Sequence, residues 1–282
     1  MARLTSQSYV KIALIILLTL ALFSVACLGS CSSWRPWSTG HTTQMLGNAN
    51  VNVDGIKNIE IDWAAGSVSV AVGEGDQIQL IETSNGLLSK AQTMRWLVAG
   101  DTLKIDYGSG WSCMSLASKH LEVRVPNALA KNIGVLSIDG VSGDYAVKGV
   151  SCDTLQVQLA SGKLDAQSVQ ARQLDLDAAS GTMRVRGVFA DSIRASVASG
   201  RAEVTCDNVC PKAIKADMAS GNVMLAIPDN PGFTARVDKM SGSFSSDFEL
   251  TMQGDRHYLY KNGEASFDFD MASGSLTLRK SS

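Results

Sequence analysis

Six aspartates share one position relative to a recurring glycine, and they are the residues of this chain best suited to chemistry. Each lies four residues before a Gly that follows Ser or Ala: Asp62, Asp139, Asp177, Asp217, Asp238 and Asp270, with Gln158 and Ser196 at the same place in two further copies. Stacked copies would align them into an aspartate ladder. Such a row could bind Ca²⁺ or supply an acid–base pair for hydrolysis of a sugar polymer.

The surrounding pattern favours a simpler interpretation of these aspartates. The Gly-Gly-x-Gly-x-Asp repeat of calcium-binding solenoids is missing. Equal spacing also predicts a uniform stripe rather than two carboxyl groups tuned to different tasks. We therefore expect a solvated polar face, and we predict no metal and no cofactor.

No other catalytic set is recognisable in the chain. The three histidines, His41, His120 and His257, have no nucleophile or carboxylate at a known spacing, and the GxSxG, HExxH and phosphate-loop motifs are absent. The Ser before each Gly recurs at successive copies, which indicates a feature of the fold. We predict that the protein is not an enzyme and has no catalytic residues.

The six cysteines divide into an N-terminal pair, Cys27 and Cys31, and four others. Cys206 and Cys210 bracket a point where one repeat lengthens, so a disulfide between them would close the widened turn. Cys152 stands where other copies have Ala and is expected to be a small buried residue. Cys113 lies in a glycine-rich loop. Four cysteines allow three pairings, and CxxxC without a nearby His is weak evidence for a metal site.

The recurring glycines indicate the architecture that must position these side chains. They are Gly66, Gly143, Gly162, Gly181, Gly200, Gly221, Gly242 and Gly274. After Gly143 the intervals are 19, 19, 19, 21, 21 and 32 residues, and the first interval, 77, is close to four times 19. A period near 20 residues is typical of stacked supersecondary units.

Each repeat predicts two short strands joined at a corner. The positions seven, five and three before each Gly are mostly apolar and alternate with polar residues, as in Leu155, Val157 and Leu159. After the Gly, the second and fourth positions are apolar, as in Met183 and Val185. The inward-facing positions are therefore odd-numbered before the Gly and even-numbered after it, so the alternation shifts by one residue at the Ser-Gly step. This change requires a bend or bulge, where Gly supplies φ > 0 or close backbone approach.

These units predict an all-β, right-handed β-solenoid with rungs of about 19–21 residues. Equivalent side chains would form columns, such as Leu136, Leu155, Leu174, Ile193 and Ile214. An antiparallel two-sheet sandwich is the alternative, although its hairpins seldom repeat side chains in register. Residues 54–130 are predicted to form irregular N-terminal rungs and 131–282 the regular repeats. Residues 73–130 and the long copy before Gly274 are expected to cap the two ends.

The N-terminus predicts attachment to a membrane. Residues 12–29 carry no charge, Arg3 and Lys11 precede them, and the first acidic residue is Asp54. Leu28-Gly29-Ser30-Cys31 resembles a bacterial lipobox, which implies lipidation of Cys31. A lipoprotein and an uncleaved transmembrane helix both remain open. Residues 1–31 are thus a signal or anchor and 32–53 a flexible linker, and 54–282 are expected outside the membrane.

Composition excludes one class of partner. The chain has 282 residues with a formal net charge of −2, which gives no electrostatic footprint for nucleic acid. The expected partners are the membrane, through the anchor, and an envelope protein or wall polymer.

Several segments together resemble a known family. The run IKNIEIDWAAGSVSVAVGEGDQIQLIE, followed by DTLKIDYG, HLEVRVP and the corners LASG, AASG, VASG and MASG, is similar to the bacterial putative-adhesin family of unknown function. The resemblance covers roughly residues 54–280. It implies a β-solenoid envelope domain without assigned catalysis, often behind a membrane anchor, and it brings no functional residues with it.

Three functions are compatible with these features. The first is a non-enzymatic, membrane-tethered envelope protein that presents a repetitive β-surface to a partner or wall polymer. The second is a sensor or regulatory partner in envelope-stress signalling. The third, least favoured by the even spacing of the aspartates, is a carbohydrate-active β-helix enzyme.

Overall fold

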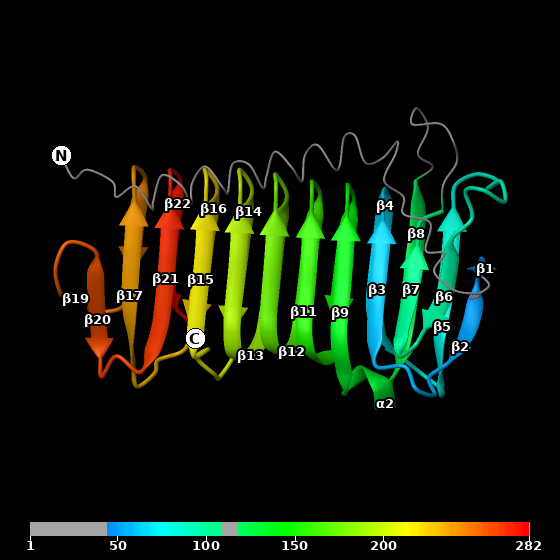
Figure 1. Ribbon diagram of the computed structural model, residues 1–282, viewed down its shortest axis with the longest axis horizontal. Helices are drawn as coiled ribbons and strands as arrows, with labels where there is room; N and C mark the ends of the chain where they lie inside the picture. The colour runs from blue at the N-terminus through cyan, green and yellow to red at the C-terminus, as the bar shows by residue number, and fades with distance from the viewer. Residues whose placement is uncertain (1–43, 109–117, 282) are drawn as a thin grey trace.

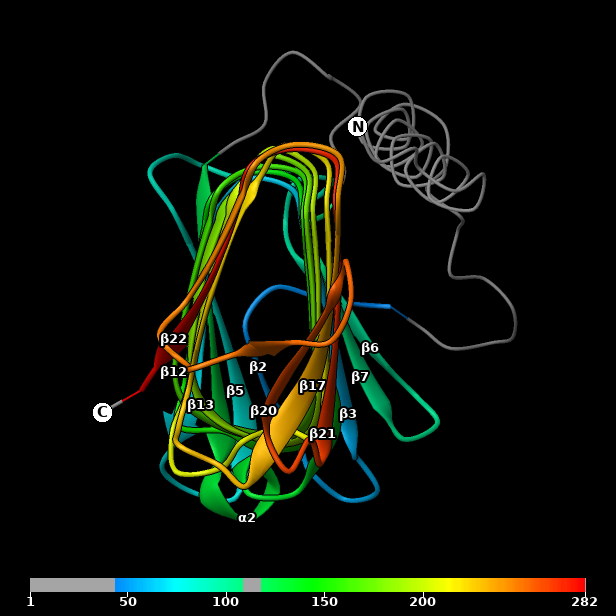
Figure 2. The same ribbon diagram turned by 90° about the vertical axis from the view of Figure 1, so that its left-hand side faces the viewer.

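The protein is an all-β structure built around one long sheet. The computed structural model describes residues 44–108 and 118–281. In this part of the chain, 22 strands form a continuous sheet, and the one helix is the short α2 (Asn127–Ala130). The sheet doubles back on itself, so that two walls face each other (Figures 1 and 2). They meet at the Ser-Gly corners along one edge and at a broader turn along the base.

The pre-corner wall contains the strands that lead into the corners. In spatial order these are β1 (Met45–Leu46), β6 (Arg95–Ala99), β7 (Thr102–Asp106), β3 (Asn58–Trp63), β9 (Ile133–Gly140), β11 (Ser151–Leu159), the second parts of β12 (Lys163–Ala178) and β13 (Thr182–Val197), β15 (Ala213–Met218), β21 (Ala265–Met271), β17 (Gly232–Lys239), β20 (His257–Lys261) and β19 (Thr251–Met252).

The post-corner wall contains the strands that leave the corners. In spatial order these are β2 (Ala49–Asn52), β5 (Gln77–Ser84), β8 (Lys119–Pro126), β4 (Gly66–Gly73), β10 (Asp144–Lys148), the first parts of β12 and β13, β14 (Arg201–Cys206), β16 (Asn222–Ile227), β22 (Ser275–Lys280) and β18 (Ser243–Ser246).

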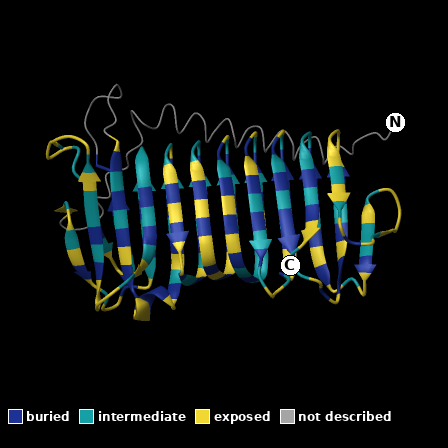
Figure 3. Cartoon of the chain, turned by 180° about the vertical axis from the view of Figure 1, so that it is seen from behind, coloured by how far each residue is buried: buried dark blue, intermediate teal, exposed yellow. Residues whose placement is uncertain are grey.

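The central rungs stack in parallel and in register, as the repeat predicts. Leu155 pairs with Leu136 on one side and Leu174 on the other. Leu155, Leu174 and Ile193 are at most 1% exposed and point into the space between the walls. The two apolar positions after the corner are equally buried, for example Met183 and Val185. The resulting alternation of buried and more exposed residues is visible along the central strands (Figure 3). This pairing is consistent with the predicted solenoid and is parallel, unlike that of the antiparallel sandwich.

Chain order and spatial order differ at both ends. The rung at Gly66 stacks directly on the rung at Gly143, because β3 pairs with β9 and β4 with β10. Most of the residues between these two rungs, including β5, β6, β7 and β8, lie outside them. At the other end, the last rung of the chain, at Gly274, lies between those at Gly221 and Gly242. Antiparallel strands then finish each end, which agrees with the expected caps.

One segment departs from the expected linker. The sequence predicts a flexible spacer over 32–53, whereas β1 and β2 form inside that range. The strands are too short for a periodic pattern to be visible. They are held because β2 adds to the edge of β5 and buries Val51, which is 5% exposed.

Close stacking explains why every corner has glycine. A Cβ built on any of the eight corner glycines would lie closer than 3.0 Å to an atom of the neighbouring rung. At Gly162 the φ angle is also +110°. Gly181, however, has no positive φ, and its Cβ would lie 2.9 Å from the carbonyl oxygen of Gly162. Of the two expected reasons for glycine, φ > 0 does not apply at Gly181, Gly200 and Gly221, whereas close backbone approach applies at all eight corners.

The serine that precedes the corner Gly, at every corner except that of Gly66, also has a structural partner. Its hydroxyl donates to a backbone carbonyl in the adjacent rung, for example from Ser180 to Ala160 at 3.1 Å and from Ser199 to Ala179 at 3.0 Å. These bonds repeat along the corner and fix the rung spacing there.

Candidate functional site

Strand pairing places the predicted aspartates in single file along the pre-corner wall. The aspartate ladder runs, in spatial order, through Asp106, Asp62, Asp139, Gln158, Asp177, Ser196, Asp217, Asp270 and Asp238. Neighbouring strands are separated by about 4.8 Å. The ladder therefore crosses nine rungs as one continuous row, with Asp106 added to the set that the sequence predicts.

The expectation of a uniform, solvated stripe is wrong. Asp106, Asp217, Asp238 and Asp270 are buried, with exposed fractions of 5–9%, and the other aspartates of the ladder are half-buried. Each side chain is packed between its in-register neighbours. The two ends of the ladder also differ in how their negative charge is compensated.

At the N-terminal end the ladder brings like charges together. Burial, and after it the adjacent carboxylates of Asp139, Glu60 and Asp106, together raise the pKa of Asp62 from 3.8 to about 7. Burial likewise raises the pKa of Asp139 to about 6, while a hydrogen bond with Asp62 opposes the rise. Two carboxyl groups side by side hold a proton between them more readily than either would alone. Near neutral pH this end is therefore partly protonated.

At the C-terminal end two arginines compensate the charge. Nη2 of Arg236 donates to Asp270 Oδ1 at 3.0 Å, and its Nε donates to Asp268 at 2.7 Å. Nη1 of Arg256 donates to Asp238 Oδ2 at 2.8 Å. Arg236 lies in β17 at the position two residues before Asp238, so the same alternation that forms the ladder also places its counter-ion.

Negative charge is less dense at the centre of the ladder than at its N-terminal end. Gln158 and Ser196 separate the carboxylates, and Lys215 lies 2.8 Å from Asp217. Burial raises the pKa of Asp177, and a hydrogen bond with Ser196 opposes this. Along its length the ladder thus changes from shared protons through neutral spacers to ion pairs. Such a surface can bind a ligand through charge and hydrogen bonds repeated at the strand spacing.

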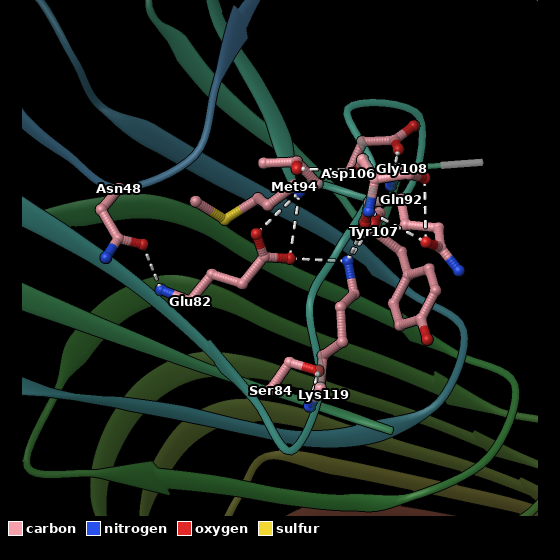
Figure 4. Close-up of polar contacts among 12 residues, drawn as sticks. Asn48, Glu82, Ser84, Gln92, Met94, Asp106, Tyr107, Gly108 and Lys119 are labelled. Atoms are coloured by element: carbon pink, nitrogen blue, oxygen red, sulfur yellow. Dashed lines mark hydrogen bonds and ion pairs between the residues drawn. The ribbon is translucent and has the colours of Figure 1, made fainter. Parts of the chain in front are cut away.

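A second polar cluster, which the sequence does not predict, lies at the N-terminal end of the stack (Figure 4). Lys119 is 2% exposed, and its Nζ donates to Glu82 Oε1 at 2.6 Å, to the Gln92 carbonyl at 2.7 Å and to the Tyr107 carbonyl. The Nζ also lies 3.9 Å from the centre of the Tyr107 ring. Glu82 in turn accepts from the Met94 backbone N–H.

This cluster is structural in character. Burial lowers the pKa of Lys119, and the hydrogen bond to Glu82 opposes the change. The ammonium group ties three separate segments of the cap together in place of water. It also lies where the first corner stacks, because the Lys119 backbone occupies the space that a Cβ on Gly66 would need. The residues around Lys119, SLASKHLEVRVP, give no local sign of such a partner.

The remaining predicted residues fall in different places. Cys31, Cys113 and His41 lie outside the described residues. Cys206 and Cys210 are free thiols in the structure, one buried and one half-buried. Burial raises the pKa of Cys206, and a smaller rise comes from Cys210.

The other residues singled out in the sequence form no catalytic group. Cys152 is buried, as expected. His120 is hydrogen-bonded to Ser67 at 2.7 Å. Among residues 44–108 and 118–281, no three His, Cys, Asp or Glu side chains converge as ligands of one metal ion. In the same ranges, no helix is both long and apolar enough to cross a membrane.

Comparison with known proteins assigns the fold to a family. A stack of parallel rungs with a glycine corner defines a repetitive all-β class of protein. Residues 56–279 match the Toastrack DUF4097 family, so the chain belongs to that family. The match indicates no enzymatic family, and no curated protein matches the chain.

Two solved structures are similar to the chain at low identity. One is a putative cell adhesion protein from Clostridium sporogenes, 12% identical, with a TM-score of 0.42 over 85% of this chain and 100% of that chain. The other is a putative adhesin from Bacteroides fragilis, also 12% identical, with a TM-score of 0.44 over 84% of this chain and 97% of that chain.

Proposed function

We propose that the protein is a non-enzymatic, membrane-tethered envelope protein whose repeated outer surface binds an external partner, either another envelope protein or a wall polymer. The observation that carries this proposal is the aspartate ladder, which continues across nine in-register rungs. A rigid row of identical spacing suits a partner that is itself repetitive or extended. Residues 12–29 supply the membrane segment and place the rungs outside the membrane. The rungs coil in the right-handed sense that parallel crossovers favour.

The arrangement of charge along the ladder supports binding rather than turnover. Asp62 and Asp139 share a proton, yet they are two members of a long row of outward positions rather than an isolated pair. Glycoside hydrolysis needs one carboxyl group to act as an acid and a second to act as a base or nucleophile across the same bond. The ladder offers a gradient of charge instead, which can orient a partner along the stack.

Sedimentation with isolated cell-wall fragments tests this proposal. We expect the full chain in detergent micelles to co-sediment with wall material. The binding can be direct, or it can occur through a detergent-extracted envelope protein that remains bound to the wall material. Gln158→Lys with Asp177→Lys, at the centre of the ladder, should weaken the association at least several-fold. Asp165→Lys, on the exposed face of the post-corner wall, is the matched control and should not.

Two outcomes contradict the proposal. Equal binding by the ladder variant and the control variant would show that the ladder takes no part in the interaction. Release of reducing ends from wall glycans that stops on Asp62→Asn or Asp139→Asn would instead establish a carbohydrate-active enzyme.

One observation favours a second function, that of a sensor. Because the pKa of Asp62 is raised to about 7, the charge at this end of the ladder changes across the neutral range. Acidification of the envelope would therefore change the affinity of a partner bound at this end. Crosslinking in cells at pH 6 and pH 8 discriminates the two functions, since a signalling protein captured at only one pH supports the sensor.

A further inference from the structure

Glu82 and Lys119 form an ion pair that is almost completely shielded from water. Their side chains are 4% and 0% exposed, and Lys119 Nζ lies 2.6 Å from Glu82 Oε1 (Figure 4). Both residues continue the inward-facing positions of their strands, in line with buried Leu80 in β5 and buried Leu121 in β8. They are diagonal neighbours on one face, because Glu82 pairs with Leu121 across the two strands. Two opposite charges are therefore held in contact inside the apolar core.

The surroundings of this pair bring its uncharged form within reach. Charges are costly in an apolar interior, and proton transfer between the two partners removes much of that cost. The rings of Tyr107 and Trp63 lie 3.9 and 4.9 Å from the Nζ and help to keep water from it. Burial also lowers the pKa of Lys119. Transfer of one proton along the existing hydrogen bond gives an amine and a carboxylic acid, which are the reactants of amide formation.

The hydrogen bonds around the pair match those that an amide at this place would need. The backbone N–H of Met94 donates to both carboxylate oxygens of Glu82, at 3.0 and 2.9 Å. It polarises the carboxyl group and would stabilise negative charge on an oxygen during attack at the carbon. The carbonyls of Gln92, at 2.7 Å, and Tyr107 accept from Lys119 Nζ. An amide oxygen would keep the Met94 donor and an amide N–H would keep one carbonyl, so both buried atoms would have partners.

We propose that Glu82 and Lys119 condense to an intramolecular isopeptide bond that locks the N-terminal end of the stack. The new bond joins Lys119 Nζ to Glu82 Cδ. The ammonium group first gives one proton to the carboxylate, and the resulting amine attacks Cδ. The hydroxyl group then leaves as water, with a second proton from the nitrogen. The third proton remains on the amide nitrogen, the two charges cancel, and no oxidant or co-reactant takes part.

The bond encloses part of the N-terminal cap in a covalent loop. Strands β6 and β7 lie between Glu82 and Lys119 in the chain, so the loop contains both of them. The proposed membrane segment precedes the cap, and tension on it would reach β1 and β2 before the regular rungs. The isopeptide bond would carry that tension from β5 directly to β8, and β6 and β7 could not be pulled out. This consequence rests on the proposed function, whereas the bond itself does not.

Peptide mass spectrometry of the full chain in detergent micelles tests the inference. After incubation at neutral pH, unfolding and trypsin digestion, the wild type should yield residues 58–90 joined to 105–124, lighter than the two peptides together by one water molecule. Lys119→Arg keeps the positive charge but cannot form the bond, so its peptides should stay separate. Glu60 and Lys104 are the matched control within the same chain. Their side chains also lie 2.6 Å apart, but they are 33% and 29% exposed and should stay unjoined.

Two results would overturn the inference. The first is complete cleavage after Lys119 in the incubated wild type, because the pair would then have stayed an ion pair. The second is equal joining of Glu60 to Lys104, because the reaction would then be unspecific dehydration. Both results are read from the wild type, so they hold even if Lys119→Arg fails to fold. Wall sedimentation measures the proposed function separately, and neither outcome of the peptide analysis changes its result.

Discussion

Replacement of corner glycines by alanine separates the two reasons for using glycine in this fold. Gly162 has both, because its φ angle is +110° and its Cβ would collide with the carbonyl of Gly143. Gly75 has φ of +89° but no atom within 4 Å of the added Cβ. Gly181 has the collision without the positive φ, and Gly86 has neither.

The expected costs follow from these two contributions. A left-handed conformation costs a non-glycine residue about 1–2 kcal/mol, and overpacking against backbone costs about 1–3 kcal/mol. Alanine gives the unfolded chain less conformational entropy than glycine does, and this stabilises the folded state by about 0.4–1 kcal/mol. Gly162→Ala should therefore lower the free energy of unfolding by about 3 kcal/mol, and Gly75→Ala and Gly181→Ala should lower it by about 1 kcal/mol each. Gly86→Ala, which meets neither penalty, should raise it by about 0.4–1 kcal/mol.

Urea unfolding at 25 °C measures these differences. Circular dichroism and fluorescence of buried Trp63 should give coincident transitions, so that one free energy describes each variant. The reasoning is refuted if Gly162→Ala costs no more than Gly75→Ala, because stacking of backbones at the corner would then contribute nothing.

Three other perturbations test the polar features of the structure. Because the pKa of Asp62 is raised from 3.8 to about 7, the folded state binds more protons than the unfolded state between about pH 4 and 7, so stability should fall as the pH rises through that window. Asp62→Asn should then stabilise the protein by about 2 kcal/mol at pH 8, after allowance for solvent screening, and should flatten the dependence of stability on pH. Asp144→Asn is the control. If Asp62→Asn leaves the pH dependence of stability unchanged, the shared proton is contradicted. Lys119→Met leaves the buried Glu82 carboxylate unpaired and should cost about 3 kcal/mol in thermal unfolding, while the double variant with Glu82→Gln should cost less than the sum of the single changes; additive costs would rule out the pair. Oxidised glutathione should convert Cys206 and Cys210 to a disulfide with release of two glutathione molecules, seen as loss of two hydrogens in the mass of the peptide; a mixed disulfide that persists on either thiol would show that they cannot meet.

Local repetition made much of the fold predictable. Alternation around each Gly identifies the inward residues, such as Leu155 and Met183, and the phase change at Ser-Gly identifies the corner. Both signals depend only on neighbours in the chain. The aspartate ladder follows from the same spacing, since side chains at equal positions must stack when strands pair in register.

The ends and the energetics of the ladder depend on contacts that no local pattern records. The pairing of β3 with β9 skips the residues of an entire cap, so the interval of 77 residues contains fewer stacked rungs than its length suggests. Asp106 belongs to the ladder without a Ser-Gly after it. Its only signal is the similarity of LKIDYG to the IEIDW segment that contains Asp62. The pairing of Arg236 with Asp270 joins residues 34 apart and became visible only once the order of the last rungs was known.

Photo-crosslinking in living cells tests the central claim most directly. A benzoylphenylalanine residue at Gln158 or Ser196 lies within the ladder, and one at Arg184 lies on the post-corner wall as the control. The account predicts that the ladder positions capture an envelope protein or wall polymer and that the control captures much less. Capture of cytoplasmic proteins, or equal capture from both walls, would contradict a partner held along the aspartate ladder outside the membrane.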